Sequence, residues 1–217
     1  MKNLLNKEMK LSASPLSYLF IAFSLMTMIP GYPILVGAFF VCFGIFQSFQ
    51  SGRENNDILY TILLPIKKTD AVKAKFAFTV FIQMVSFVCF ALLTFLRMAF
   101  LPNAAPYVSN PMMNANQAFL AYILLTFALF NCVFLCGFFK TAYKFGKPFI
   151  VFLIVSFVFV GAAEAVHHFP GLEFLNDTAA FGNAAMWIML VAAVIVYAAA
   201  TAAACSISMK RFEKVDM

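Results

Sequence analysis

The sequence predicts an all-α membrane protein, and its composition is the first observation behind this prediction. Of 217 residues, 64% are hydrophobic and only 11% are charged, whereas a soluble domain is about half apolar and a quarter charged. A domain of this size leaves much of its surface in water, so it cannot bury such an excess of apolar residues. The same composition excludes intrinsic disorder, and five Cys do not make a disulfide-rich secreted scaffold.

Long apolar stretches are the second observation. A helix needs about 20 residues to cross about 30 Å of hydrocarbon, and six stretches approach this length. They are Pro15–Ile29, Ile34–Phe49, Phe76–Leu96, Ala118–Phe139, Pro148–Val166 and Ala184–Ile207. The first two are short and are separated only by residues 30–33, whose two Pro and one Gly cannot continue a helix. We therefore predict six transmembrane helices, the first two forming a tight hairpin.

The placement of basic residues is the third observation. With six spans, both termini and the loops 50–75 and 140–147 share one side of the membrane. Apart from Arg97, that side holds every basic residue: Lys2, Lys7, Lys10, Arg53, Lys67, Lys68, Lys73, Lys75, Lys140, Lys144, Lys147, Lys210, Arg211 and Lys214. By the positive-inside rule this side is cytoplasmic, so both termini are predicted to be cytoplasmic.

Residues 1–13 are predicted to form an amphipathic helix that lies in the membrane interface. On a helical projection one arc is apolar, with Met1, Leu4, Leu5, Met9 and Leu11, and Lys and Asn residues lie opposite. Glu8 falls within the apolar arc, where a carboxylate is costly without a partner. Two interpretations stay open: a frayed end with Glu8 in water, or an anchor in which Glu8 pairs with a basic residue of the next loop.

The loop 50–75 contains a short predicted helix of its own. A polar segment, 54–57, precedes the apolar segment 58–64, and Pro65 follows directly. Acidic residues at the start and Pro at the end are typical of a helix. An apolar surface with a charged rim is typical of a protein–protein contact. The alternative is a helix that packs beneath the bundle or on the lipid surface.

Several motifs of the chain form a familiar combination. They are Lys7-Glu8, then Glu54-Asn55-Asn56, Leu64-Pro65-Ile66-Lys67-Lys68-Thr69-Asp70 and Val72-Lys73-Ala74-Lys75-Phe76, and finally Ser206-x-Ser208-x-Lys210 with Phe212-Glu213-Lys214 and Asp216. In this combination the chain resembles the permease subunits of bacterial ABC transporters of the ABC-2 type, in particular the short six-span permeases encoded apart from their ATPase. The resemblance covers the whole chain, and the Leu-Pro loop is its most specific part.

The resemblance implies a role for each part of the chain. Residues 1–13 would be an interfacial elbow helix, residues 14–209 a six-span permease domain and residues 210–217 a cytoplasmic tail, in a bacterial cell membrane. The loop 50–75 would contain a coupling helix that docks in a groove of a cytosolic ATPase. The docking residues would be Glu54, Asn55, Asn56, Asp57, Tyr60, Leu63, Leu64, Pro65, Lys67 and Lys68. The loop 140–147 is short and has no acid, unlike the family's pattern, so a second docking contact there stays open.

The chain lacks the motifs of a hydrolase. It has no Gly-x-x-x-x-Gly-Lys-Ser/Thr loop, so we expect ATP and Mg²⁺ to be bound by the partner ATPase and not by this chain. The one acid within a span, Glu164, has His167 three residues on, which is typical of an interfacial pair. Cys132 and Cys136 share a helix face without a His or carboxylate nearby, so no metal site is predicted. We expect that the chain is not an enzyme.

Two charged residues lie near the outer ends of predicted spans. Arg97 and Glu164 are both costly in lipid unless they pair or reach water. Our hypothesis is an ion pair that helps to close the extracellular side. The alternative is that each side chain reaches water independently.

The function predicted from the resemblance is that of the membrane permease of an ATP-driven exporter. Its expected partners are two copies of an ATPase, a second permease chain (identical or related) and membrane lipid, without nucleic acid. The 29 Phe and 12 Met favour an apolar pathway, and hence a hydrophobic or amphipathic cargo such as a peptide or a lipid-like molecule. The alternatives are the substrate-capture subunit of a vitamin importer, a membrane enzyme of unrecognised type, and a non-pumping sensor or immunity protein.

Overall fold

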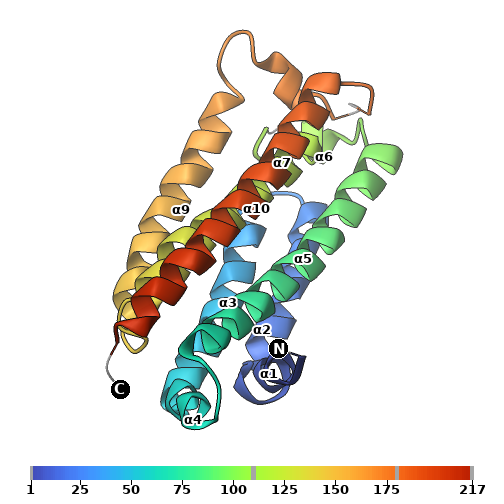
Figure 1. Cartoon of the computed structure of the whole chain (residues 1–217). Coiled ribbons are helices and arrows are strands. Elements are labelled where there is room, and N and C mark those ends of the chain that lie inside the picture. Colours follow the sequence, from blue (N-terminus) through green and yellow to red (C-terminus); the bar gives the residue numbers. More distant parts are fainter. Residues whose placement is uncertain (1, 109–110, 179–180, 216–217) are drawn as a thin grey trace.

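The computed structural model describes residues 2–108, 111–178 and 181–215, and within these ranges all regular structure is helical. Long helices run beside one another as a bundle (Figure 1). The elements in chain order are α1 (Lys2–Lys7), the π-helix η1 (Glu8–Ser12), α2 (Pro15–Leu19), the 3₁₀-helix η2 (Phe20–Met28), α3 (Val36–Glu54), α4 (Asp57–Leu63), α5 (Lys68–Phe100), α6 (Ala105–Val108), the 3₁₀-helix η3 (Pro111–Met113), α7 (Gln117–Leu129), the π-helix η4 (Phe130–Leu135), α8 (Cys136–Phe138), α9 (Gly146–Val166), the 3₁₀-helix η5 (Glu173–Asn176) and α10 (Ala184–Glu213).

All six apolar stretches are helical, and four or five of them qualify as membrane spans. By length and composition the candidates among the described residues are α5, α7 continued through η4 and α8, α9, and α10. A fifth is possible if 3–12 and 15–28, which meet at 95°, count as one broken span. The helix α3 is not among them, since its last turns are polar and end in Arg53 and Glu54. The prediction of six spans therefore stays a prediction.

The first apolar stretch is not a uniform α-helix. It begins as α2, where the Ser14 side chain accepts a hydrogen bond from Leu16 N and Pro15 occupies the first turn, as helix starts favour. It then continues as the 3₁₀-helix η2, which packs closely on α3. A Cβ atom added at Gly44 of α3 would lie 2.6 Å from Cβ of Phe20, so only glycine allows this approach.

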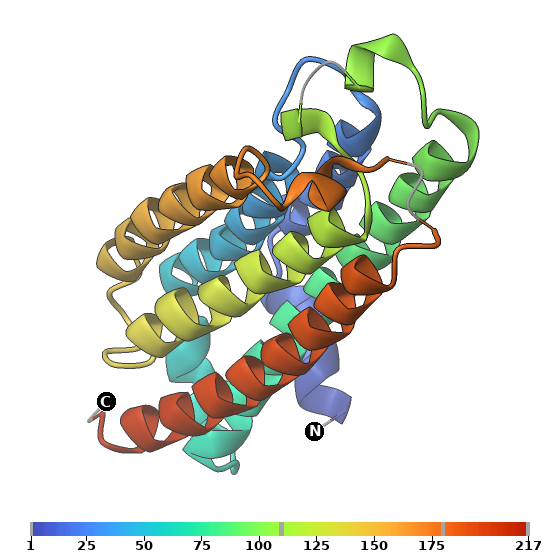
Figure 2. The same ribbon diagram turned by 90° about the horizontal axis from the view of Figure 1, so that it is seen from above.

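The helix α7, with η4 and α8, forms the centre of the bundle. Of its most apolar window, 78% is buried inside the chain, against 17–39% for α5, α9 and α10. The helix α10 runs alongside α7 and contacts it extensively (Figure 2). The three outer helices therefore present apolar faces to the surroundings, as membrane helices do.

Phenylalanine supplies much of the interior between α3, η4 and α9. The rings of Phe46 and Phe149 stack with centroids 3.9 Å apart. Phe130 stacks on Phe134 at 4.8 Å and meets Phe152 edge to face at 5.0 Å. Many of the 29 Phe thus pack within one chain, so the Phe content by itself gives no information on a cargo pathway.

Both ends of the described chain lie at the same end of the bundle. Figure 1 shows the N- and C-terminal labels beside α1 and α4, with α6 at the opposite end. We call the first the termini end and the second the α6 end. The remaining long elements run between these ends, so the turn that joins α8 to α9 also lies at the termini end (Figures 1 and 2).

The N-terminal segment differs in detail from the predicted amphipathic helix. Leu5 and Met9 pack against the core as expected, but Leu11 is 77% exposed and Ser12 is buried beside Glu8. The cause is the π-helix η1, whose wider turns rotate the last residues relative to a continuous α-helix. Met1 of the predicted arc and Asp216 of the predicted tail lie outside the described residues.

Candidate functional site

The helix α4 has two chemically different faces at the termini end. Asp57 and Thr61, one turn apart, are buried against the bundle. Tyr60 and Leu63 point outward and are 65% and 76% exposed. The helix starts after Asn56, whose left-handed backbone (φ 51°) reverses the chain. It ends at Leu63, two residues before Pro65. The predicted helix is therefore present, and it begins and ends one residue earlier than the apolar segment 58–64.

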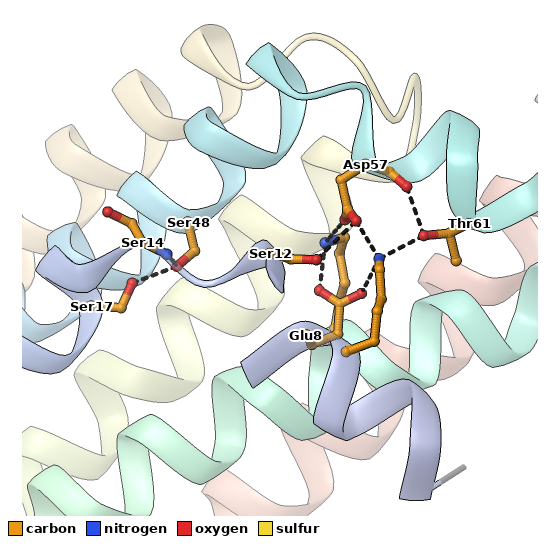
Figure 3. Close-up of polar contacts among 9 residues, drawn as sticks. Glu8, Ser12, Ser14, Ser17, Ser48, Asp57 and Thr61 are labelled. Carbon is orange, nitrogen blue, oxygen red and sulfur yellow. Dashed lines mark hydrogen bonds and ion pairs between the residues drawn. The ribbon is translucent and has the colours of Figure 1, made fainter. Parts of the chain in front are cut away.

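A buried group of charges lies beneath α4. Lys75 Nζ of α5 donates to Glu8 Oε2 of η1 at 2.7 Å and to Asp57 Oδ2 of α4 at 2.8 Å. Lys7 Nζ lies 3.0 Å from Glu8 Oε1 and also contacts the Asp57 carboxylate. Two lysines and two carboxylates thus alternate around one centre (Figure 3). We call these four residues the charge cluster.

Hydroxyl groups complete the bonding of the charge cluster. Ser12 Oγ donates to Asp57 Oδ1 at 2.8 Å, and Lys7 Nζ donates to Thr61 Oγ1 at 2.6 Å (Figure 3). Thr61 Oγ1 in turn donates to the carbonyl of Asp57 at 2.6 Å. With these bonds the cluster joins α1, η1, α4 and α5. Charges taken out of water are tolerated only when they are paired and hydrogen-bonded in this way.

The electrostatics of the cluster favour the ionised form of Asp57. Burial alone would raise the pKa of this carboxyl, but Lys75 and Lys7 outweigh it through their charges and hydrogen bonds. The pKa is lowered from 3.8 to about 2. Asp57 is therefore charged at neutral pH.

Serines tie the start of the first apolar stretch to α3. Ser48 Oγ accepts a hydrogen bond from Ser14 N at 2.8 Å and shares one with Ser17 Oγ at 2.6 Å (Figure 3). Ser17 Oγ also lies 2.6 Å from the carbonyl of Gly44. This second anchor fixes the segment that follows the charge cluster, so η1 is held on both sides.

The residues predicted to dock fall into two groups. Those with exposed side chains are Glu54, Asn55, Asn56, Tyr60, Leu63, Leu64, Pro65 and Lys67. Lys68 is half-buried and donates to the carbonyl of Val215 at 2.8 Å. Asp57 is only 8% exposed, and its carboxylate is occupied by the charge cluster. The prediction that Asp57 lies on the docking surface is corrected accordingly, because Lys7 and Lys75 draw its side chain inward.

Sequence reasoning did not identify most partners of α4. It left open whether Glu8 pairs with a basic residue of the loop 50–75, and the structure places Glu8 on Lys75 of that loop. Lys7, Ser12 and Thr61 were missed. The spacing of Asp57 and Thr61, four residues apart in a short helix, is the sequence signal that marks an inward polar face.

The proposed ion pair near the α6 end is not formed. Arg97 donates to the carbonyl oxygens of Thr27 (2.7 Å) and Met113, and its guanidinium stacks over the ring of Tyr107 at 3.7 Å. No ion pair within the described residues joins it to Glu164. The reason is that η2 and η3 both end beside Arg97, and the guanidinium satisfies one carbonyl group at the end of each.

A polar group also lies within the bundle. The side-chain amides of Gln83 in α5 and Asn131 in η4 bond to each other at 3.0 and 3.1 Å. Tyr197 and Thr201 of α10 add hydrogen bonds of 2.8 and 2.9 Å to this pair. The bonds connect α5, η4 and α10 within the bundle.

The structure thus defines a polytopic helical membrane protein that presents an amphipathic helix, anchored by buried charges, at its termini end. The family model described as "ABC-2 family transporter protein" matches residues 3–213, and the chain belongs to this family. It is therefore the permease of an ABC transporter, and membership implies an ATPase partner. No curated protein and no solved structure matches the chain.

Proposed function

We propose that the chain is the permease of an exporter and that α4 is its coupling helix, which binds the ATPase. One observation carries this proposal: α4 exposes Tyr60 and Leu63 on one side while Asp57 on the other is bound to the charge cluster. An exposed apolar side chain costs free energy in water, and an apolar patch with a polar rim is typical of a binding surface. A helix that is bound to the bundle on one face and accessible to a partner on the other can transmit a displacement from that partner to the bundle.

The termini end is proposed to face the cytoplasm, where the ATPase is. Apart from Arg97, the basic residues all lie in segments at this end, and basic residues accumulate on the cytoplasmic side of membrane proteins. The elbow helix would then be α1 with η1. Its anchor would be Glu8, buried against Lys75.

The charge cluster is proposed to carry the movement of α4 into the bundle. Lys75 belongs to α5, which extends from Lys68 at the termini end to Phe100 at the α6 end. When the ATPases close on ATP, a displacement of α4 would act on α5 and η1 together, since all three share the cluster. This is a rigid-body mechanism.

The remaining parts of the transporter follow from this assignment. Two ATPase chains would bind ATP and Mg²⁺, and two permease chains would enclose the pathway between them, while this chain would catalyse no reaction and hold no metal. A hydrophobic or amphipathic cargo would suit the apolar side chains that α5, α9 and α10 expose. Movement of such a cargo requires contacts that change as the two permeases rearrange.

Binding to the ATPase tests the docking assignment. The partner ABC ATPase that family membership implies is purified separately, and its affinity is measured for the chain and for Leu63→Asp. We expect the affinity for Leu63→Asp to be at least about tenfold lower, because a central apolar contact contributes about 2 kcal/mol to binding. The matched control is Leu11→Asp, since Leu11 is 77% exposed and Leu63 76%. Equal affinity of Leu63→Asp and the unaltered chain contradicts the assignment of α4.

Transport distinguishes the exporter from an importer subunit or a sensor. The chain and its ATPase are reconstituted in vesicles with the ATP-binding side outward, and a fluorescent amphipathic peptide is added on the same side. ATP-dependent accumulation inside the vesicles is expected for an exporter. ATP-dependent loss of preloaded peptide, or binding without transport, contradicts it.

A further inference from the structure

A cavity of about 230 Å³ opens beside α4 at the termini end. Its walls come from the end of α3, α4, the start of α5, α8 with the turn that follows it, and Val215 after α10. Apolar side chains such as Leu59 and Phe138 line it, together with Arg53 and Lys75. The volume is below the roughly 300–1,000 Å³ of clefts for drug-sized ligands, so it suits one or two side chains.

Arg53 is a fixed cation at the edge of this cavity. Its guanidinium lies 4.4 Å from the ring centre of Tyr143 and 5.0 Å from that of Phe145, both in the turn before α9. Such stacking holds the planar group in one orientation. Glu54, next in sequence, is bonded by Gln50 at 3.3 Å instead. Among the described residues, no carboxylate lies within ion-pair distance of Arg53.

The second cation of the cavity is shared with the charge cluster. Lys75 is 6% exposed and bonds to Glu8 and Asp57, so its charge is compensated within the chain. The charge that the cavity leaves uncompensated is therefore that of Arg53. A carboxylate is the group whose geometry a guanidinium matches, with two parallel hydrogen bonds.

The cavity is continuous with the proposed docking surface. Leu59 of α4 lines the cavity and is 52% exposed, and Tyr60 beside it belongs to the outward face. An occupant that contacts the outward face of α4 would therefore reach the cavity without crossing lipid. This continuity favours a protein partner over a lipid headgroup.

We propose that this cavity receives an acidic side chain of the ATPase, which pairs with Arg53 while an apolar neighbour fills the space beside Leu59. The inference rests on the proposed function of α4 and deepens it. It assigns a docking role to the loop 140–147, which the sequence leaves open, because Tyr143 and Phe145 hold Arg53 in place. Docking would then involve two cytoplasmic loops and not α4 alone.

Charge reversal with rescue tests the pair. Affinity for the same purified ATPase is measured for Arg53→Glu and for Arg53→Met, which keeps a similar stem and removes the charge. We expect a loss of about thirtyfold for Arg53→Glu, as for truncation of a desolvated charge pair. The matched control is Lys144→Glu, an exposed cation of the same turn that does not line the cavity, and it should change affinity less than threefold. Exposed Asp and Glu residues of the ATPase are then changed to Lys one at a time, and one change should restore binding to Arg53→Glu.

The outcomes separate this inference from the function on which it rests. If Leu63→Asp weakens binding but Arg53→Glu and Arg53→Met do not, α4 still docks and the cavity assignment is wrong. Loss of binding that no ATPase variant restores also overturns the inference. If Arg53→Glu binds the ATPase normally but no longer binds vesicles of phosphatidylglycerol, the cavity holds a lipid headgroup instead. If neither Leu63→Asp nor Arg53→Glu weakens binding, the proposed function itself fails. Unchanged thermal unfolding temperatures (Tm) show that each variant is folded.

Discussion

Lys75 Nζ lies 2.7 Å from Glu8 Oε2, so the start of α5 and the π-helix η1 are joined by a buried ion pair. The same amine lies 2.8 Å from Asp57 Oδ2 of α4. One lysine therefore connects the N-terminal segment, the proposed coupling helix and the long helix α5. Neither carboxylate can be removed from this site without leaving a buried charge.

Removal of the central lysine is predicted to be costly. Lys75→Met should lower the free energy of unfolding by about 3–5 kcal/mol, because Glu8 and Asp57 lose a shared buried partner. The control is Lys73→Met on the same helix. Lys73 is half-exposed and lies 3.8 Å from Asp70, and such surface pairs contribute under about 1 kcal/mol. Denaturant titration in detergent micelles measures the unfolding free energy of both variants. Similar losses for the two variants would contradict a structural role of the cluster.

Stability is predicted to depend on acid pH through Asp57. Its pKa is about 2 in the folded chain against 3.8 ordinarily, so folding favours the ionised form. This contribution, about 2 kcal/mol at 1.36 kcal/mol per unit, is complete above about pH 4 and is lost as the pH falls through 2. The difference in unfolding free energy between the unaltered chain and Asp57→Asn should therefore be constant above pH 4 and shrink below it. A difference that is independent of pH from 5 to 2 would exclude this linkage.

The polar group within the bundle is predicted to couple α5 and η4. Gln83→Leu leaves the Asn131 amide without its main partner, and Asn131→Leu does the same to Gln83. The decrease in unfolding free energy of the double variant should be smaller than the sum of the two single decreases. We expect a difference of about 0.6–1.7 kcal/mol, the range found for hydrogen bonds between membrane helices. Unfolding in mixed micelles gives all four values of the cycle. Strict additivity would show that the amide pair contributes nothing as a pair.

The sequence predicts the positions of the helices well because the signals are local. Apolar length predicts the stretches that become α5, α9 and α10, and Pro65 predicts where α4 ends. It does not predict that residues 20–28 form a 3₁₀-helix or that η1 and η4 are π-helices. The 3₁₀ segment takes part in close tertiary contacts, such as the approach of Phe20 to Gly44, which no local propensity contains.

Side-chain pairing is the part of the candidate site that the sequence predicts least. Charge and span position suggest a pair of Arg97 with Glu164, but carbonyl groups of two other segments, η2 and η3, satisfy Arg97. A backbone carbonyl carries no sequence signal, so such a partner is invisible before the fold is known. Asp57 illustrates the same limit, because its place on α4 is predicted while its direction depends on Lys75, 18 residues away.

Two glycine substitutions are predicted to differ in their effect on stability, and the difference tests the close packing of η2 on α3. At Gly44 an added Cβ would lie 2.6 Å from Cβ of Phe20, a contact with no flexible atom to move, so Gly44→Ala should cost about 1–3 kcal/mol as overpacking does. At Gly161 in α9 nothing lies within 4 Å of the added atom, and Gly161→Ala should be neutral or stabilise by up to about 1 kcal/mol, since alanine loses less backbone entropy in a helix.

The comparison uses the isolated chain in detergent, with Tm and denaturant midpoints as readouts. Because both changes add one methyl group within a helix, a difference between them reports the local space alone. If Gly44→Ala is as stable as Gly161→Ala, the 3₁₀ segment does not pack on α3 at this distance, and the serine contacts beside Gly44 would hold it less tightly than the structure indicates.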